Sequence, residues 1–226
     1  MMLPRFVVMG GQNEIFINMY GNSKSLIPVN SGNNVAIEQN SDYPVSDKVE
    51  VIVNPGNSEN FTISFRIPEW STNTEISING TPVSGITSGV YKKITREWKK
   101  SDKVVLKMDL TGRVIILNGY QALVRGPVVL ARDTRFGDGF IYESAVIKEM
   151  NGTVELIPSL KKPSNVWMSF TAPLLLGTDL EGKFRNPLQI NFCDFASSGN
   201  TWDEDSRYRV WIPKTLNVMN AEYKSY

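Results

Sequence analysis

Apolar and polar residues alternate with a period of two along much of the chain. The segment 61–67 alternates without interruption and places Phe61, Ile63, Phe65 and Ile67 on one face of an extended strand. The same pattern recurs in three further sets: Val49, Val51 and Val53; Val104, Leu106, Met108 and Leu110; Tyr208, Val210 and Ile212. A period of two predicts half-buried β-strands in all of these segments.

Turn-forming sequences separate the alternating segments at intervals of about one strand. The strongest is Asn79-Gly80, because both residues tolerate the positive φ angles that a type I′ hairpin requires. Further turn signals lie at 54–56, 100–102, 137–139 and 151–152. No window of a dozen residues shows helical periodicity. The pattern predicts an all-β fold of two antiparallel β-sandwich domains in tandem.

The domain boundary is expected near Thr111-Gly112. The chain has 226 residues, which fits two sandwiches of about 110 residues each. A strand is predicted up to Leu110, and a new apolar segment begins after Gly112. We therefore expect the first β-sandwich at residues 1–112 and the second at residues 113–226.

The balance of charges argues against nucleic acids and anionic membranes as partners. The chain has 24 lysines and arginines against 23 acidic residues, so no dominant field attracts phosphate backbones or anionic lipids. No apolar run approaches the roughly 18 residues of a membrane span. Neither nucleic acid nor a membrane is expected as a partner. Residues 1–6 lack the basic and apolar regions of a secretion signal, so the chain carries no indication of its localisation.

The rarest residues limit the chemistry that the chain can perform. It contains no histidine, which excludes Ser-His-Asp, Cys-His and His-zinc centres built from its own residues. Cys193 is the only cysteine, so no intramolecular disulfide can form, and we expect its side chain to be buried. No cofactor is expected.

Acidic residues gather at Asp203, Glu204 and Asp205. Glycoside hydrolysis generally uses two carboxyl groups on either side of the scissile bond, but adjacent residues direct their side chains apart. The same acids could bind calcium, although their spacing lacks the glycine and distal glutamate of an EF-hand loop. A solvated loop is the favoured interpretation, so we assign no catalytic and no metal-binding residue. An enzyme that uses this loop is the least favoured hypothesis.

The five tryptophans are the remaining candidates for a binding site, since an indole can stack on a sugar ring. Core packing is the default expectation. Trp70 and Trp98 lie at strand ends and are expected to plug the edges of a sandwich. Trp202 lies among Ser, Gly, Asn and Asp residues, and we select it as the candidate carbohydrate-binding residue.

Seven short segments also resemble a known family when they are taken in order. They are residues 15–20, 40–44, 65–70, 78–80, 91–98, 125–131 and 208–213. Their order and spacing resemble the C-terminal part of the β-L-arabinofuranosidase-like glycoside hydrolases of family 127, or DUF1680 type. The resemblance covers nearly the whole chain.

In that family an (α/α)6 barrel precedes the β-sandwich domains and carries the chemistry. The family uses a glutamate acid/base and a zinc-bound cysteine nucleophile held by further cysteines and a glutamate, and the single Cys193 cannot rebuild this site. The resemblance therefore implies a non-catalytic accessory region of a bacterial enzyme of carbohydrate metabolism, one that scaffolds an active site on a separate barrel. Such a parent protein is expected to be periplasmic or secreted.

Two kinds of partner follow from this interpretation. The first is the helical barrel domain, whose contact surface would be apolar. The N-terminal segment Phe6, Val7, Val8 and Met9 is the candidate surface, and self-association through it is expected when the barrel is absent. The alternative is an independent carbohydrate-binding module that recognises a plant-type oligosaccharide with exposed aromatic residues.

Overall fold

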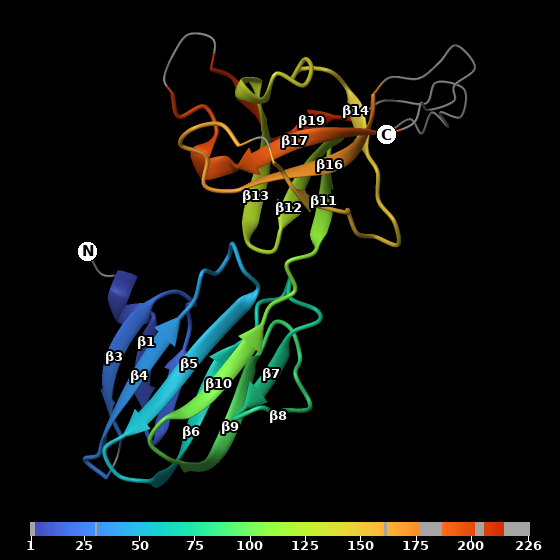
Figure 1. Ribbon diagram of the computed structural model, residues 1–226. Coiled ribbons are helices and arrows are strands. Elements are labelled where there is room, and N and C mark those ends of the chain that lie inside the picture. The colour runs from blue at the N-terminus through green and yellow to red at the C-terminus, as the bar shows by residue number, and fades with distance from the viewer. Residues whose placement is uncertain (1–2, 30, 161, 177–186, 202–205, 215–226) are drawn as a thin grey trace. The chain divides into compact units, whose positions relative to one another are not determined.

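The computed structural model describes residues 3–29, 31–160, 162–176, 187–201 and 206–214. The chain divides into two compact units, Met1–Leu110 and Thr111–Tyr226 (Figure 1). Within the described residues the only helical elements are three short 3-10 turns: η1 (Leu3–Phe6), η2 (Thr134–Phe136) and η3 (Phe195–Ser197). The predicted all-β fold is confirmed. Across the same residues, no helix is long and apolar enough to span a membrane.

The first unit contains two sheets. One sheet has the strand order β1-β2-β6-β9. Its strands are β1 (Val8–Gly11), β2 (Glu14–Ile17), β6 (Glu59–Arg66) and β9 (Tyr91–Trp98). β2 pairs with β6 in parallel, with Ile15 opposite Ile63, whereas the other two pairings are antiparallel. This parallel pair is the one departure from the expected antiparallel sandwich in the first unit.

The other sheet of the first unit is antiparallel and has the order β3-β4-β5-β10-β7-β8. Its strands are β3 (Ser23–Pro28), β4 (Asn34–Asn40), β5 (Lys48–Pro55), β7 (Glu75–Ile78), β8 (Thr81–Pro82) and β10 (Asp102–Lys107). The predicted turn joins β7 to β8, with φ angles of 50° at Asn79 and 84° at Gly80. This hairpin prediction is confirmed.

A single apolar cluster fills the space between the two sheets. The predicted set Phe61, Ile63, Phe65 and Ile67 is fully buried. The other sheet contributes the remaining predicted residues of β5 and β10: Val49, Val51, Val53, Val104 and Leu106. The period of two therefore identified the core of the first unit.

The two tryptophans of the first unit also follow expectation. Trp98 is fully buried at the end of β9, and Trp70 is partly buried against the apolar cluster. Ser64 is the polar exception in β6, because its side chain is buried although the alternating pattern places it opposite the core. Its hydroxyl donates a hydrogen bond to the Glu14 carboxylate, which accounts for a polar residue at this position.

The second unit is formed by one nine-stranded antiparallel sheet that encloses its own core. The main path is β11-β12-β13-β17-β16-β14, and β15, β18 and β19 pair with β16, β13 and β12 respectively. The strands are β11 (Gly112–Leu117), β12 (Tyr120–Arg125), β13 (Val128–Asp133), β14 (Ala145–Ile147), β15 (Ile157–Pro158), β16 (Ser169–Leu176), β17 (Leu188–Asp194), β18 (Tyr208–Arg209) and β19 (Ile212–Pro213). The core includes Leu123, Leu130, Phe170, Leu174, Ile190 and Phe192.

The predicted strand through Tyr208, Val210 and Ile212 is wrong as a continuous, half-buried element. The segment instead forms the two short strands β18 and β19, which pair with different neighbours. Ile212 is fully buried, whereas Tyr208 is 46% exposed. Alternation predicted one face for the whole segment, but the change of partner at Val210 and Trp211 breaks that face.

Candidate functional site

Most of the candidate site residues from the sequence lie in the segment 202–205. Trp202, Asp203, Glu204 and Asp205 lie outside the described residues. Cys193 is fully buried, as predicted. Burial raises the pKa of its thiol to about 12, so the thiolate that would act as a nucleophile or metal ligand is disfavoured at neutral pH.

The clearly shifted carboxyl groups of the described residues all have lowered pKa values. In the first unit, hydrogen bonds from Ser64 and then Lys93 lower the pKa of Glu14, and hydrogen bonds from Ser31 and Asn33 lower that of Glu59. Lys103, 2.8 Å away, does the same for Glu50. A glycosidase acid needs a raised pKa, so none of these groups suits that role. In the described ranges, no three Asp, Glu or Cys side chains form a group that could hold a metal ion.

The most promising surface feature is an aromatic pocket in the second unit. Its volume is about 520 Å³, and it is lined by Tyr120, Val129, Phe195, Tyr208, Arg209, Val210 and Trp211. We call this set the aromatic pocket. Its four aromatic side chains are 39–48% exposed, so their rings are accessible to a ligand. No carboxylate of the described part of the chain lines it.

The local strand pairing creates this pocket. β12 and β13 pair with each other only over residues 123–125 and 128–130. Beyond that region, β13 pairs with Tyr208 and Arg209, and β12 pairs with Ile212 and Pro213. The residues between these two short strands, Val210 and Trp211, therefore connect the ends of β12 and β13 and contribute directly to the pocket lining.

Contacts within the lining orient its side chains. The rings of Phe195 and Tyr208 meet edge to face, with centroids 5.7 Å apart. The Arg209 guanidinium lies 5.3 Å from the centre of the Tyr142 ring, and its Nε donates to the carbonyl oxygen of Trp211 at 2.8 Å. Each of these residues therefore has a partner that limits its movement.

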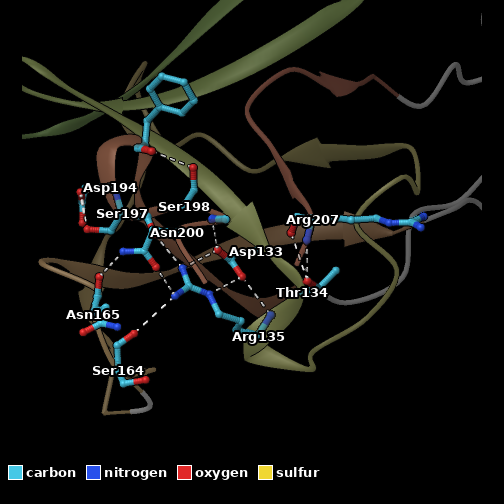
Figure 2. A network of polar contacts seen from close by, with 12 residues as sticks. Asp133, Thr134, Arg135, Ser164, Asn165, Asp194, Ser197, Ser198, Asn200 and Arg207 are labelled. Atoms are coloured by element: carbon cyan, nitrogen blue, oxygen red, sulfur yellow. Dashed lines mark hydrogen bonds and ion pairs between the residues drawn. The ribbon is translucent and has the colours of Figure 1, made fainter. Parts of the chain in front are cut away.

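A buried ion pair supports the segments that carry Phe195 and Tyr208 (Figure 2). Arg135 donates to both carboxylate oxygens of Asp133, at 2.9 Å from Nε and 2.7 Å from Nη2. Burial would raise the pKa of Asp133, but hydrogen bonds from Arg135 and from the Gly199 N–H outweigh it and hold the pKa below its usual value. The Asp133 carboxylate is therefore ionised in the folded protein at neutral pH.

The ion pair extends into a network that fixes two further segments. Arg135 donates to the carbonyl oxygen of Ser197 and to Oδ1 of Asn200, and Figure 2 shows its guanidinium pointing toward the Asn200 side chain. Thr134 and Arg207 exchange hydrogen bonds, at 2.9 Å from Thr134 N to Arg207 O and 3.0 Å from Arg207 N to Thr134 Oγ1. One short stretch, 133–135, thus holds residue 207 beside Tyr208 as well as the segment 197–200.

Asp194 anchors the other side of the aromatic pocket. It precedes η3, and its Oδ2 accepts hydrogen bonds from the N–H and hydroxyl of Ser197 while its Oδ1 accepts one from the Met168 N–H. These bonds cap the turn that presents Phe195.

Sequence reasoning missed this pocket. Trp211 was expected in the core by default, but it is 39% exposed, and Tyr120 and Phe195 were not singled out at all. Trp167 is also exposed, at 51%, although it does not line the pocket. The sequence feature that could have indicated the pocket is the density of aromatic and basic residues in Tyr208-Arg209-Val210-Trp211. The alternation of apolar and polar residues predicts only a strand for this segment.

Comparison with known proteins finds similarity to glycoside hydrolases. Residues 14–110 match the family model described as β-L-arabinofuranosidase, GH127 middle domain. A crystal structure of a GH127 β-L-arabinofuranosidase from Geobacillus stearothermophilus T6 is similar with a TM-score of 0.76 and 20% identity, over 93% of this chain and 35% of that protein. No curated protein matches the sequence.

Two further solved structures give the same result. A GH127 β-arabinofuranosidase has a TM-score of 0.73 and 20% identity, over 94% of this chain and 37% of that protein. A protein described as a glycoside hydrolase has a TM-score of 0.70 and 25% identity, over 89% of this chain and 36% of that protein. The chain spans about a third of the length of each of these proteins. In fold it thus resembles a β-rich part of the GH127 β-L-arabinofuranosidases, and its residues 14–110 match the model of the middle domain of that family.

Proposed function

We propose that the chain is the non-catalytic β-sandwich portion of a glycoside hydrolase related to the GH127 β-L-arabinofuranosidases. In this role it supports or shapes an active site on a separate helical barrel domain. The observation that carries the proposal is the match of residues 14–110 to the GH127 middle domain. The similarity to about a third of each related structure supports it, because the catalytic apparatus would then belong to another part of the parent protein.

The electrostatics of the described residues favour a scaffold over a catalyst. Asp133 forms a buried ion pair with Arg135, and Glu50 forms an ion pair with Lys103. These carboxylates have pKa values below their ordinary range, which suits structural ion pairs and not a proton donor to a leaving group. The one cysteine is buried with a raised thiol pKa, so it does not offer a nucleophile.

Enzyme assays and a binding assay test the scaffold proposal together. The purified chain should release no nitrophenol from aryl glycosides, including β-L-arabinofuranosides, above a buffer blank. A purified GH127 helical barrel domain, prepared without its own β-sandwiches, should bind the chain and should lose less activity on heating when the chain is present. Turnover by the chain alone that survives repurification would show that it is itself an enzyme, and failure to bind the barrel would remove the scaffold role.

The second candidate function is independent recognition of a carbohydrate by exposed aromatic side chains, with a plant-type oligosaccharide as ligand. The observation that favours it is the aromatic pocket, since flat apolar rings with a few polar groups are common features of ligand sites. Trp202, which directly follows the segment 197–201, is proposed as an additional contact on sequence grounds. Affinity electrophoresis of the chain in gels that contain soluble polysaccharides distinguishes this function from a purely structural role.

A further inference from the structure

We infer that the aromatic pocket of the second unit is a binding site for a short, neutral saccharide. The inference rests on the second candidate function, carbohydrate recognition, and assigns a location and a ligand class to it. It does not depend on the scaffold proposal.

The first step is the number of exposed rings that converge on one cavity. Tyr120, Phe195, Tyr208 and Trp211 come from β12, η3, β18 and the residues before β19, and each leaves between 39% and 48% of its surface exposed. A single exposed apolar side chain is ordinary on a protein surface, but a contiguous apolar patch marks a binding site. Four rings from four segments line one volume of about 520 Å³, and this convergence makes the volume the candidate site.

The composition of the lining points to a saccharide. Sugar rings present C–H groups on their faces and hydroxyl groups at their edges, so they fit aromatic faces combined with a few polar groups. The aromatic pocket supplies both, because Trp211 and Phe195 offer apolar rings, and Tyr120 and Tyr208 carry hydroxyl groups that both donate and accept hydrogen bonds.

The charge of the lining favours a neutral ligand. Among the residues that the structure describes, Arg209 is the only charged one that lines the aromatic pocket. Its guanidinium already lies against the Tyr142 ring, and its Nε donates to the carbonyl oxygen of Trp211. A site for a phosphate or a uronic acid would be expected to present several cationic donors to the ligand. A neutral saccharide needs only the hydroxyl and C–H contacts that the pocket provides.

The aromatic pocket is also pre-organised. Tyr208 follows Arg207, which is fixed by its paired hydrogen bonds with Thr134. Gly199 is held by the Asp133 carboxylate and lies so close to the Tyr208 ring that a Cβ at this position would come within 2.6 Å of it. Rings that are already ordered lose little conformational entropy when a ligand binds, so a small number of stacking contacts gives measurable affinity.

The test uses the full chain, three tryptophan variants and Tyr208→Ala, which removes a second ring of the aromatic pocket. Affinity electrophoresis should identify a retarding polysaccharide from a set that includes arabinan, arabinoxylan, xyloglucan and β-glucan, and calorimetry with its oligosaccharides gives the dissociation constant. Trp211→Ala should weaken binding by about tenfold or more, because central aromatic residues dominate such sites. Trp211→Tyr keeps an aromatic face and should retain most of the affinity. Trp167→Ala is the matched control, because it removes an exposed indole of the same unit that does not line the pocket.

The binding results distinguish the saccharide site from the scaffold role and from carbohydrate recognition elsewhere on the chain. Retention by a polysaccharide that Trp211→Ala abolishes and Trp167→Ala preserves would support the saccharide site. Retention that survives Trp211→Ala and Tyr208→Ala would overturn the location while leaving carbohydrate recognition in place. Absence of retention on every polysaccharide would overturn the inference and the second candidate function together, without affecting the scaffold proposal. Unchanged near-ultraviolet circular dichroism of each variant shows that a loss of binding does not come from unfolding.

Discussion

The indole Nε1–H of Trp98 donates a hydrogen bond to the carbonyl oxygen of Phe61 at 3.0 Å. Both side chains are fully buried, and their rings lie 6.1 Å apart with a tilt of 31°. The bond connects the last residue of β9 to the backbone of β6, so one side chain both fills the edge of the core and satisfies a backbone acceptor there. Tryptophan is the only residue type that combines this volume with an indole donor.

Substitutions at Trp98 separate its packing from its hydrogen bond. Trp98→Ala should lower the free energy of unfolding of the first unit by about 3–5 kcal/mol, the usual effect of emptying a large aromatic site. Trp98→Phe retains most of the packing but removes the donor to the Phe61 carbonyl, and a loss of about 1–3 kcal/mol is expected. Chemical denaturation measures both values. Equal losses for the two variants would show that the hydrogen bond carries the whole effect.

Two positions on β6, Phe65 and Thr62, test which face of the strand is buried in the core and which is not. Phe65→Ala should destabilise the first unit by about 3–5 kcal/mol, because its side chain is fully buried in the core. Thr62 lies on the other face and shares a hydroxyl–hydroxyl hydrogen bond with Thr95 at 2.8 Å. Thr62→Ala should therefore cost less than about 1.5 kcal/mol. Urea denaturation of both variants would contradict the assignment if Thr62→Ala were the more damaging change.

The ion pair between Asp133 and Arg135 predicts a pH dependence of the second unit. The pKa of Asp133 is lower in the folded state than the unfolded value of about 3.9, so its stabilising contribution is complete above that value. The contribution is lost as the pH falls from the unfolded pKa through the folded one. Asp133→Asn should therefore destabilise the second unit by about 3 kcal/mol at pH 7, and the difference from the wild type should shrink below about pH 4.

Hydrogen exchange of β13 and β17 measures this effect in the second unit alone. Glu97→Gln is the control and is followed in β6 and β9, because Glu97 lies in the first unit. Glu97 and Lys99 form an ion pair that is exposed on both sides, and such pairs contribute about 0–1 kcal/mol. A difference between Asp133→Asn and wild type that stayed constant down to pH 2 would mean that the carboxylate charge is not the source of the stability.

The N-terminal segment predicts self-association of the purified chain. Phe6 and Met9 are 46% and 40% exposed, whereas Val8 is buried and Val7 packs partly against the core. Of the four residues expected to contact the barrel domain, Phe6 and Met9 are therefore exposed, whereas the expectation for Val8 is wrong because its side chain belongs to the core. Sedimentation velocity at increasing concentration should reveal oligomers that Phe6→Ser combined with Met9→Ser suppresses. A chain that sediments as a monomer at every concentration, and binds no dye for apolar surfaces, would favour a module that functions alone.

Alternation predicted the first unit well because its strands each have one buried and one solvent-facing side. The apolar residues of 61–67 and 104–108 lie where the period of two places them, and Ser64 is the one exception in these segments. The Asn79-Gly80 turn was predictable because its backbone geometry selects those residue types. The parallel pairing of β2 with β6 was not predictable, since it joins strands more than forty residues apart, and nothing in either strand specifies the direction of its neighbour.

The aromatic pocket escaped prediction for a related reason. Tyr120, Phe195, Tyr208 and Trp211 are brought together only when β18 and β19 pair with separate strands. The alternation of apolar and polar residues predicts which face of a sheet a residue occupies as long as its strand continues. It cannot predict that the segment pairs with β13 up to Arg209 and with β12 from Ile212. The supporting ion pair was equally hidden, because alternation gives no reason to expect a carboxylate such as Asp133 in a buried position.

The place of β10 in its sheet has a consequence for the order in which the first unit can fold. β10 is the last strand of that unit along the chain, yet it lies between β5 and β7, and β7 reaches the rest of the sheet only through it. A nascent chain that ends before Asp102 leaves two facing strand edges with unpaired backbone groups. During synthesis these unpaired edges can pair with other chains until about residue 107 has emerged from the ribosome. The smallest fragment that folds on its own should therefore extend through Lys107, and fragments that stop at Trp98 should aggregate.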